Sequence, residues 1–172
     1  MKIYLIGLPS SGKTTLGKQL AVAVKSTFID MDDLIEKQEG KTIAEIFAKN
    51  GEDYFREVEQ KTLLNLVNTV NGNQIISTGG GVPCFFDNME QMNTDGMTIY
   101  LKVSPKELVK RLTGTGTASR PLLQGKKNQE LEDEITNKLK QRDQYYSQAK
   151  HILDGDKLHV NDLINLVKYV VD

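Results

Sequence analysis

The eight residues from Gly7 to Thr14 have the spacing of a loop that binds phosphate. They read Gly-Leu-Pro-Ser-Ser-Gly-Lys-Thr and fit the pattern G-x-x-x-x-G-K-[ST] at every fixed position, between a predicted strand and a predicted helix. Small residues let backbone N–H groups surround a phosphate, Lys13 can bridge β- and γ-phosphate oxygens, and the Thr14 hydroxyl can bind Mg²⁺. A plain glycine-rich turn would not require this set, so we predict a nucleotide site.

Two carboxylates, Asp30 and Asp32, follow the second predicted strand. Residues two apart on a strand project from the same side, so we expect both beside the phosphate loop. Carboxylates there suit binding of Mg²⁺ through water and orientation of a hydroxyl group that accepts a phosphoryl group. An N-cap with a solvated acidic cluster at the start of the next helix is the alternative, and we favour the functional interpretation.

A second group of residues could form a binding site or serve only the fold. Arg56 and Glu59 are three residues apart, so on a helix the carboxylate could brace the guanidinium beside Phe55. Such a pair is more often a surface ion pair. Gly79 to Gly81 could let a backbone approach a ligand closely, or could form a sharp turn. Spacing alone leaves these alternatives open.

Three further arginines lie near or beyond a predicted loop. Closure of that loop could carry Arg120 onto a transferring phosphate, and Arg111 precedes the same loop. Arg142 falls on a predicted helix among other charged residues. From the sequence alone, ordinary solvated charge is a sufficient explanation of all three arginines.

Short apolar runs alternate with helical patterns, which is typical of an α/β protein with a mainly parallel sheet. The predicted strands are residues 2–6, 27–29, 74–77, 97–101 and 151–153, and the predicted helices are residues 12–24, 34–38, 54–70, 105–112 and 130–150. Further helices are predicted to begin at Thr42 and Asn161, and the spacings Thr42-x-x-Glu45 and Ser104-x-x-Glu107 predict capping boxes.

These elements predict a three-layer α/β/α fold of the P-loop NTPase type with a sheet of five strands. Right-handed crossovers bring the strand-to-helix loops to one edge of the sheet, where a ligand should bind. Residues 113–127 carry glycines and a proline without an apolar period, so we expect a mobile lid loop there. We expect one domain over residues 1–172.

Composition narrows the classes of partner. The chain has 172 residues, 22 Lys plus Arg against 23 Asp plus Glu, and a single cysteine. A net charge of −1 provides no broad positive field, so we expect no nucleic-acid partner, and no apolar run approaches the roughly 20 residues of a membrane span. We expect a cytoplasmic protein that is a monomer and binds small molecules rather than membranes.

Taken in order, several segments resemble the shikimate kinase family over nearly the whole chain. The segments are GLPSSGKTT at 7–15, FIDMDDLIE at 28–36, GKTIAEIF at 40–47, GEDYFREVE at 51–59, STGGGV at 77–82, SRPLL at 119–123 and KQRDQYY at 140–146. Many families share the phosphate loop, whereas the combination of Asp-x-Asp, Phe-Arg-x-x-Glu, Gly-Gly-Gly and Arg-Pro-Leu-Leu in this order is specific.

The resemblance implies a role for each residue on the nucleotide side. ATP would be held by Lys13 and the backbone amides of residues 10–15, which are Ser10, Ser11, Gly12, Lys13, Thr14 and Thr15. The Thr14 hydroxyl would bind Mg²⁺, with Asp30 acting through water. Arg120 on the lid would reach the phosphates, and Arg111 would lie near the adenine. In the loop that begins at Asp154, the adenine contact could come from Lys157 or from backbone alone.

The resemblance also implies an acceptor side. Asp32 would contact the shikimate hydroxyls and act as the base or orienting group. Arg56, Arg142 and the Gly80 amide would hold the acid, since planar guanidinium groups match a carboxylate in two-point contacts. Glu59 would brace Arg56, while Phe47 and Phe55 would form a wall for the ring.

We therefore expect ATP-dependent phosphorylation of the 3-hydroxyl of shikimate on the route to chorismate and the aromatic amino acids. Lys13, Asp32 and Arg120 would be the catalytic residues, and Mg²⁺ would be the cofactor. The alternatives are another small-molecule kinase of the same fold, such as a gluconate-type kinase, and a nucleotide-binding regulator without catalysis.

Overall fold

The computed structural model describes residues 1–69, 72–114 and 128–171, and for residues 169–171 it describes the backbone only. Within these ranges the strands are β1 (Lys2–Ile6), β2 (Thr27–Asp30), β3 (Gln74–Ser77), β4 (Met97–Lys102) and β5 (His151–Asp154). The helices are α1 (Lys13–Ala23), α2 (Met31–Glu39), α3 (Ile43–Asn68), the short 3₁₀ helix η1 (Val82–Cys84), α4 (Asn88–Asp95), α5 (Pro105–Gly114), α6 (Asn128–Tyr146) and α7 (Val160–Val171).

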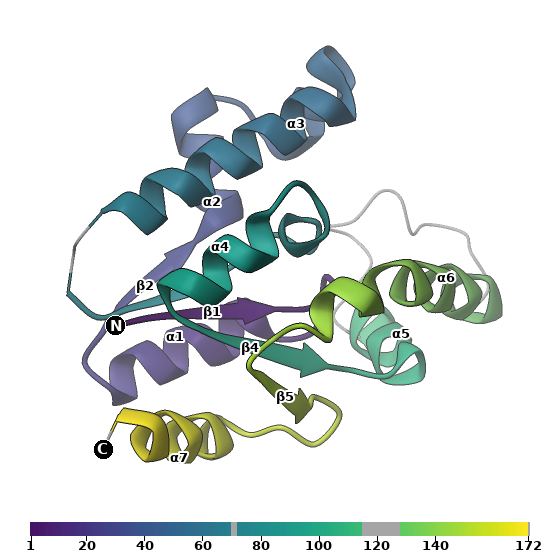
Figure 1. Ribbon diagram of the computed structural model, residues 1–172. Helices are drawn as coiled ribbons and strands as arrows, with labels where there is room; N and C mark the ends of the chain where they lie inside the picture. Colours follow the sequence, from purple (N-terminus) through teal and green to yellow (C-terminus); the bar gives the residue numbers. More distant parts are fainter. Residues whose placement is uncertain (70–71, 115–127, 172) are drawn as a thin grey trace.

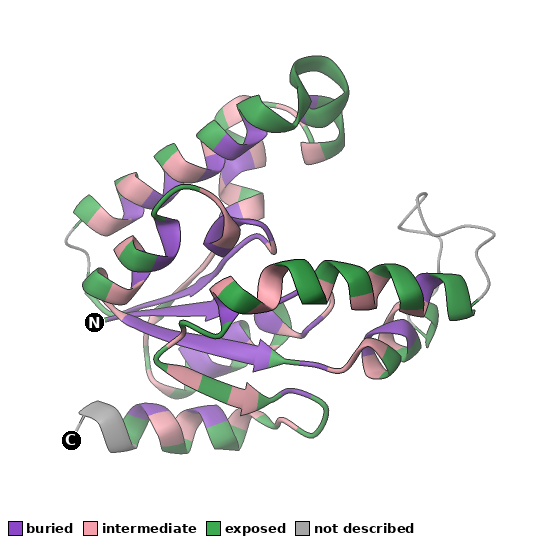
Figure 2. Cartoon of the chain, turned by 45° about the vertical axis from the view of Figure 1, so that its right-hand side comes forward, coloured by how far each residue is buried: buried purple, intermediate pink, exposed green. Residues whose placement is uncertain are grey.

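The five strands form one sheet in the order β2-β3-β1-β4-β5, and every neighbouring pair is parallel. This confirms the predicted α/β class and the mainly parallel sheet. Strands β1 and β4 lie inside the sheet and carry almost only buried residues, as Figure 2 shows. Continuous burial of this kind is expected when helices cover both faces of a parallel sheet.

Alternation along β1 divides the core into two apolar layers. Tyr4 and Ile6 pack on the face covered by α2, α3, α4 and α6, whereas Ile3 and Leu5 pack on the face covered by α1 and α7. Figure 1 shows α2, α3 and α4 on one side of the sheet and α1 and α7 on the other. The predicted three-layer α/β/α arrangement is therefore confirmed.

Several predicted helix boundaries are wrong, and at α2 a side-chain cap moves the start. Helix α2 begins at Met31 rather than at residue 34, since the Asp30 carboxylate caps it and accepts a hydrogen bond from the Asp32 N–H at 3.1 Å. Helix α6 ends at Tyr146 rather than at residue 150. Asn161 lies inside the first turn of α7 instead of capping it.

The two predicted capping boxes have different outcomes. In the first, the Glu45 N–H donates to Thr42 Oγ1 at 3.2 Å and the Thr42 N–H donates to Glu45 Oε2 at 2.8 Å, so the box is complete. In the second, the Glu107 N–H donates to Ser104 Oγ at 3.3 Å, but the Ser104 N–H donates to an aspartate of another loop. The second prediction is therefore only half correct.

The break predicted at Gly51 is present. Within α3 this residue has a φ of 84°, which is not helical and suits glycine, so two helical segments meet there. The departures concern the remaining loops. The sequence pattern did not reveal η1 or α4. Helix α5 continues through Gly114, so the predicted lid begins later than residue 113, and its remainder, with Arg120, lies outside the described residues. Among the described residues, no helix has the length and apolarity to cross a membrane.

The Thr42 cap gives a test of the fold. We expect Thr42→Ala to lower the free energy of unfolding by about 1 kcal/mol, because the Glu45 N–H then loses its partner at the start of α3. Urea unfolding at pH 7 measures the change. Thr69→Ala is the matched control, since that hydroxyl donates to the Asn65 carbonyl at the exposed far end of the same helix. Equal losses in both variants would contradict the capping role.

Candidate functional site

The loop from Gly7 to Thr14 joins β1 to α1 at the carboxyl edge of the sheet. Its conformation depends on two glycines with positive φ, Gly7 at 144° and Gly12 at 98°. A Cβ on Gly7 would lie 2.9 Å from the Leu101 carbonyl oxygen, so a larger residue would push the loop away from β4. The Lys13 ammonium donates to the carbonyls of Gly7 at 3.0 Å and Leu8 at 2.9 Å and so folds over the loop.

A cavity of about 480 Å³ opens above this loop. It is lined by Ser10, Gly12, Lys13, Thr14, Thr15, Leu16, Arg111, Gly155 and Leu158. All but one of the residues predicted to contact the nucleotide from residues 10–15 therefore reach the cavity. Ser11 does not line it, because its side chain is buried beneath the loop. On the far side the cavity is lined by Gly155 and Leu158, whereas Lys157 is not among the lining residues.

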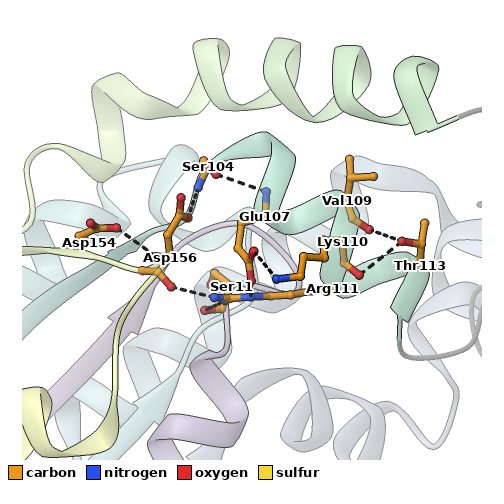
Figure 3. A network of polar contacts seen from close by, with 10 residues as sticks. Ser11, Ser104, Glu107, Val109, Lys110, Arg111, Thr113, Asp154 and Asp156 are labelled. Atoms are coloured by element: carbon orange, nitrogen blue, oxygen red, sulfur yellow. Dashed lines mark hydrogen bonds and ion pairs between the residues drawn. The ribbon is translucent and has the colours of Figure 1, made fainter.

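Arg111 links the two ends of this cavity. Its Nη1 donates to the Ser11 carbonyl at 3.2 Å and its Nη2 donates to the Gly155 carbonyl at 2.8 Å. Its Nε donates to Glu107 Oε1 at 3.0 Å, and Figure 3 shows these contacts converging on the guanidinium. The guanidinium thus connects the phosphate loop with the loop between β5 and α7.

Thr14, which lines the cavity, pairs with Asp30. The Thr14 hydroxyl donates to Asp30 Oδ2 at 2.7 Å and lies 3.4 Å from the Ser77 hydroxyl. Asp30 reaches Thr14 from β2, although β3 lies between β2 and β1 in the sheet. Hard oxygen donors of this kind suit Mg²⁺, which keeps several water molecules and needs only one or two protein ligands. The described residues contain no cluster of three or more metal-binding side chains.

A second cavity of about 160 Å³ lies beside the first. It is lined by Pro9, Asp32, Ile43, Phe55, Arg56, Glu59, Gly79, Gly80, Gly81 and Arg142. The structure therefore brings four charged residues together beside the glycine run: Asp32 from α2, Arg56 and Glu59 from α3, and Arg142 from α6. From the sequence alone, each of them also had an ordinary structural explanation. The two carboxylates predicted to project from the same side of a strand do not do so, because Asp32 belongs to the first turn of α2. Asp32 lines the second cavity, whereas Asp30 contacts Thr14.

Arg56 is the most constrained charge of this second cavity. Only 8% of the residue is exposed, and the guanidinium pairs with Glu52 at 2.8 Å and with Glu59 at 2.5 Å. It lies 4.3 Å from the ring centre of Phe85 and 5.3 Å from that of Phe55. The predicted brace by Glu59 is present in this geometry, and the surface ion pair is excluded as an explanation.

The three consecutive glycines each leave room for a neighbouring side chain. A Cβ on Gly79 would lie 2.7 Å from Glu59 Oε1 and 2.8 Å from Asp32 Oδ1. A Cβ on Gly81 would lie 2.2 Å from Nη1 of Arg56. The run therefore makes a turn that lets the carboxylates and the guanidinium approach the backbone.

Burial perturbs both carboxylates of the second cavity. Loss of solvent, aided by the nearby charge of Asp30, raises the pKa of Asp32 to about 6, while the Lys13 ammonium opposes the rise. Burial likewise raises the pKa of Glu59 to about 7, although Arg56 opposes it. Two carboxylates with raised pKa values in one cleft are typical of a functional site.

Two contacts of this site were missed from the sequence. Phe85 stacks on Arg56, but it follows a glycine-proline turn and has no periodic pattern that could reveal it. The buried Tyr146 hydroxyl donates to the Gly80 carbonyl, which also accepts from Nη1 of Arg142 at 3.0 Å. Tyr146 lies four residues after Arg142 on one helix, so helical spacing could have placed the two on one face. Phe47 contacts Phe55 at 4.7 Å between ring centres but does not line the cavity.

Comparison with known proteins identifies relatives of the whole chain. The sequence model of the family described as shikimate kinase matches residues 9–170. The shikimate kinase of Bacteroides fragilis is 48% identical over 158 residues, which are 92% of this chain and 87% of that protein. The shikimate kinase of Parabacteroides distasonis is 41% identical over 174 residues and 99% of both chains.

Solved structures agree with the sequence relatives. The crystal structure of shikimate kinase from Bacteroides thetaiotaomicron superposes with a TM-score of 0.90 at 40% identity, covering 99% of this chain and 98% of that chain. Shikimate kinase from Acinetobacter baumannii in complex with shikimate gives a TM-score of 0.82 at 33% identity, covering 99% of this chain and 92% of that chain.

The raised pKa of Asp32 predicts how stability depends on pH. An acid with a raised pKa binds more protons in the folded state than in the unfolded state, so its contribution to stability falls as pH rises from about 4 to above 6. We expect Asp32→Asn to remove that fall. Relative to the parent protein it should gain about 2 kcal/mol between pH 4 and pH 8, measured by urea unfolding.

Asp33→Asn is the control for this measurement, because Asp33 lies in the same first turn of α2 but is exposed to solvent. It should change the pH dependence little. If the stability of Asp32→Asn depends on pH in the same way as that of the parent protein, burial does not raise the pKa of Asp32.

Proposed function

The chain belongs to the shikimate kinase family, and from that premise we propose that it transfers the γ-phosphoryl group of ATP to the 3-hydroxyl of shikimate. The products would be 3-phosphoshikimate and ADP, on the route to chorismate and the aromatic amino acids. One observation carries the proposal: neighbouring residues of the phosphate loop line different cavities, Ser10 the larger and Pro9 the smaller. Phosphate donor and acceptor would therefore meet at this loop.

We assign the larger cavity to ATP. Lys13 would release the carbonyls that it contacts and bind β- and γ-phosphate oxygens, and the N–H groups of residues 10–15 would surround the phosphates. Arg111 would lie against the adenine, and the lining by Gly155 and Leu158 favours a backbone and apolar contact over one from Lys157. When bound, Mg²⁺ would neutralise phosphate charge, held by the Thr14 hydroxyl and, through water, by Asp30.

We assign the smaller cavity to shikimate. The guanidinium groups of Arg56 and Arg142 would hold its carboxylate, because planar donors match a carboxylate in two-point contacts. The Gly80 amide would contact the ring substituents, and Phe55 would support the ring. A volume of about 160 Å³ with two cations and two carboxylates suits a small polar acid better than a large apolar molecule.

Asp32 would orient the acceptor hydroxyl and take its proton. Its raised pKa of about 6 leaves the carboxylate ionised at pH 7 yet more basic than an exposed aspartate. The rate acceleration would come mainly from alignment of the hydroxyl oxygen with the γ-phosphorus and from positive charge on the transferring group. Lys13 would supply part of that charge, and Arg120 would supply more from the lid outside the described residues.

We further propose that residues 1–172 act as one catalytic domain, as a monomer in the cytoplasm. The near-neutral charge supports small-molecule substrates over a nucleic acid. A gluconate-type kinase would show turnover with another polyol acid and none with shikimate. A regulator would bind ATP without any acceptor-dependent release of ADP.

The arginines of the smaller cavity give the kinetic test. We expect Arg56→Ala and Arg142→Ala each to raise KM for shikimate by more than about tenfold, because each removes a charge-assisted contact to the carboxylate. KM for ATP should stay within about twofold. A coupled assay of ADP release measures both constants, and Lys13→Met should abolish turnover.

Lys140→Ala is the control for charge, since Lys140 is exposed on the helix that carries Arg142. Its kinetics should match those of the parent enzyme. If Arg56→Ala and Arg142→Ala leave KM for shikimate unchanged while turnover with shikimate persists, the acceptor lies elsewhere and the assignment of the smaller cavity fails.

The proposed base gives a second test, in the pH profile. An aspartate that must be ionised makes kcat/KM for shikimate rise with pH up to a pKa of about 6 and level off above it. We expect Asp32→Asn to lower kcat by at least about 100-fold and to remove this acid limb. The exposed neighbour variant Asp33→Asn should keep it. An unchanged acid limb in Asp32→Asn would assign the titration to another group.

A further inference from the structure

The start of α5 has the sequence of a capping box but not its geometry. In a complete box the side chain of Glu107 would accept a hydrogen bond from the Ser104 N–H. Here the Glu107 N–H does donate to Ser104 Oγ at 3.3 Å, so Ser104 performs its half. The reciprocal half is missing, because the Glu107 carboxylate turns away toward Arg111.

Asp156 occupies the place that Glu107 leaves. Its Oδ1 accepts a hydrogen bond from the Ser104 N–H at 2.7 Å, across 52 residues of chain. Its own N–H donates to Asp154 Oδ1 at 3.1 Å, so the turn after β5 directs the carboxylate toward α5. Figure 3 shows Asp154, Asp156 and Ser104 in one row of contacts. A carboxylate at a helix start is also favoured by the helix dipole.

The released Glu107 carboxylate orients Arg111. It accepts from Nε at 3.0 Å and leaves the two terminal nitrogens of the guanidinium to face the cavity wall. Those nitrogens donate to the Ser11 carbonyl of the phosphate loop and to the Gly155 carbonyl next to Asp156. The chain of contacts therefore begins and ends in the loop between β5 and α7.

We propose that Asp156 is a positioning residue for the nucleotide, which acts through Glu107 and Arg111. By occupying the Ser104 N–H it prevents Glu107 from closing an ordinary capping box and keeps that carboxylate on Arg111. Without Asp156 the Ser104 N–H becomes available to the Glu107 carboxylate, which Lys110 also contacts at 3.4 Å, and Glu107 divides between Ser104 and Arg111. Arg111 then loses its fixed orientation at the wall of the larger cavity. The proposal rests on the assignment of that cavity to ATP.

A simple cap is the competing explanation for the Asp156 contact. A cap that only stabilises α5 would affect unfolding without changing nucleotide binding selectively. The two explanations also differ in their dependence on Glu107, because only the positioning role requires that carboxylate. A double-mutant cycle therefore separates them.

The experiment measures ADP binding by calorimetry and KM for ATP by ADP release in the full chain. We expect Asp156→Ala to weaken ADP binding and raise KM for ATP about five- to tenfold, with KM for shikimate within about twofold of the parent value. Asp156→Asn should restore binding, because its Oδ1 still accepts from the Ser104 N–H. In a Glu107→Ala background, Asp156→Ala should add less than about twofold.

Asp162→Ala is the matched control. Its exposed carboxylate also accepts one backbone hydrogen bond, from the His159 N–H at 2.9 Å near the start of α7, and it does not line the cavity. ADP binding should remain unchanged in this variant. Unaltered ADP binding in Asp156→Ala, or a full additional loss in the Glu107→Ala background, would overturn the proposal. Absence of shikimate turnover with these binding differences intact would instead refute the proposed function alone.

Discussion

The burial of Arg56 is the constraint on which the smaller cavity of this structure depends. A guanidinium withdrawn from water is costly unless charges and hydrogen-bond acceptors surround it. Glu52 and Glu59 supply the acceptors, and the Phe85 ring covers one face of the cation. That enclosure leaves no space for a Cβ on Gly81, so the glycine turn and the ion pair require each other. The charge of Arg56 is therefore satisfied by the protein's own residues.

The same enclosure explains why the pKa values of the carboxylates in this pocket are raised. Glu59 is held beside Arg56, and the nearby charge of Asp32 raises the pKa of Glu59, while burial raises the pKa of both carboxylates. Stability is lower when both are ionised, but an ionised, poorly solvated carboxylate is a better proton acceptor. The fold therefore concentrates unfavourable negative charge in the smaller cavity, at a cost in stability.

Much of this arrangement could be predicted from local sequence because local physics determines it. The apolar run of β1, the glycines before Lys13 and the Thr42 box each specify one conformation from a few adjacent residues. Predictions failed where the choice of a helix cap or a distant partner decided the outcome. Asp30 caps α2 and separates Asp32 from the strand, Asp156 replaces Glu107 at Ser104, and the roles of Arg56 and Arg142 depend on a turn that no spacing within their own helices reveals.

Pro9 lines the smaller cavity and Ser10 the larger, so at the phosphate loop the linings of the two cavities are one residue apart. Consecutive Cα atoms are about 3.8 Å apart, and this distance does not change with temperature, ionic strength or repacking of the surrounding helices. Substitutions in α2, α3 or α6 can change the lining of the smaller cavity without changing this spacing at the loop. The residues that line the smaller cavity can therefore vary while its boundary with the larger cavity at Pro9 and Ser10 stays the same.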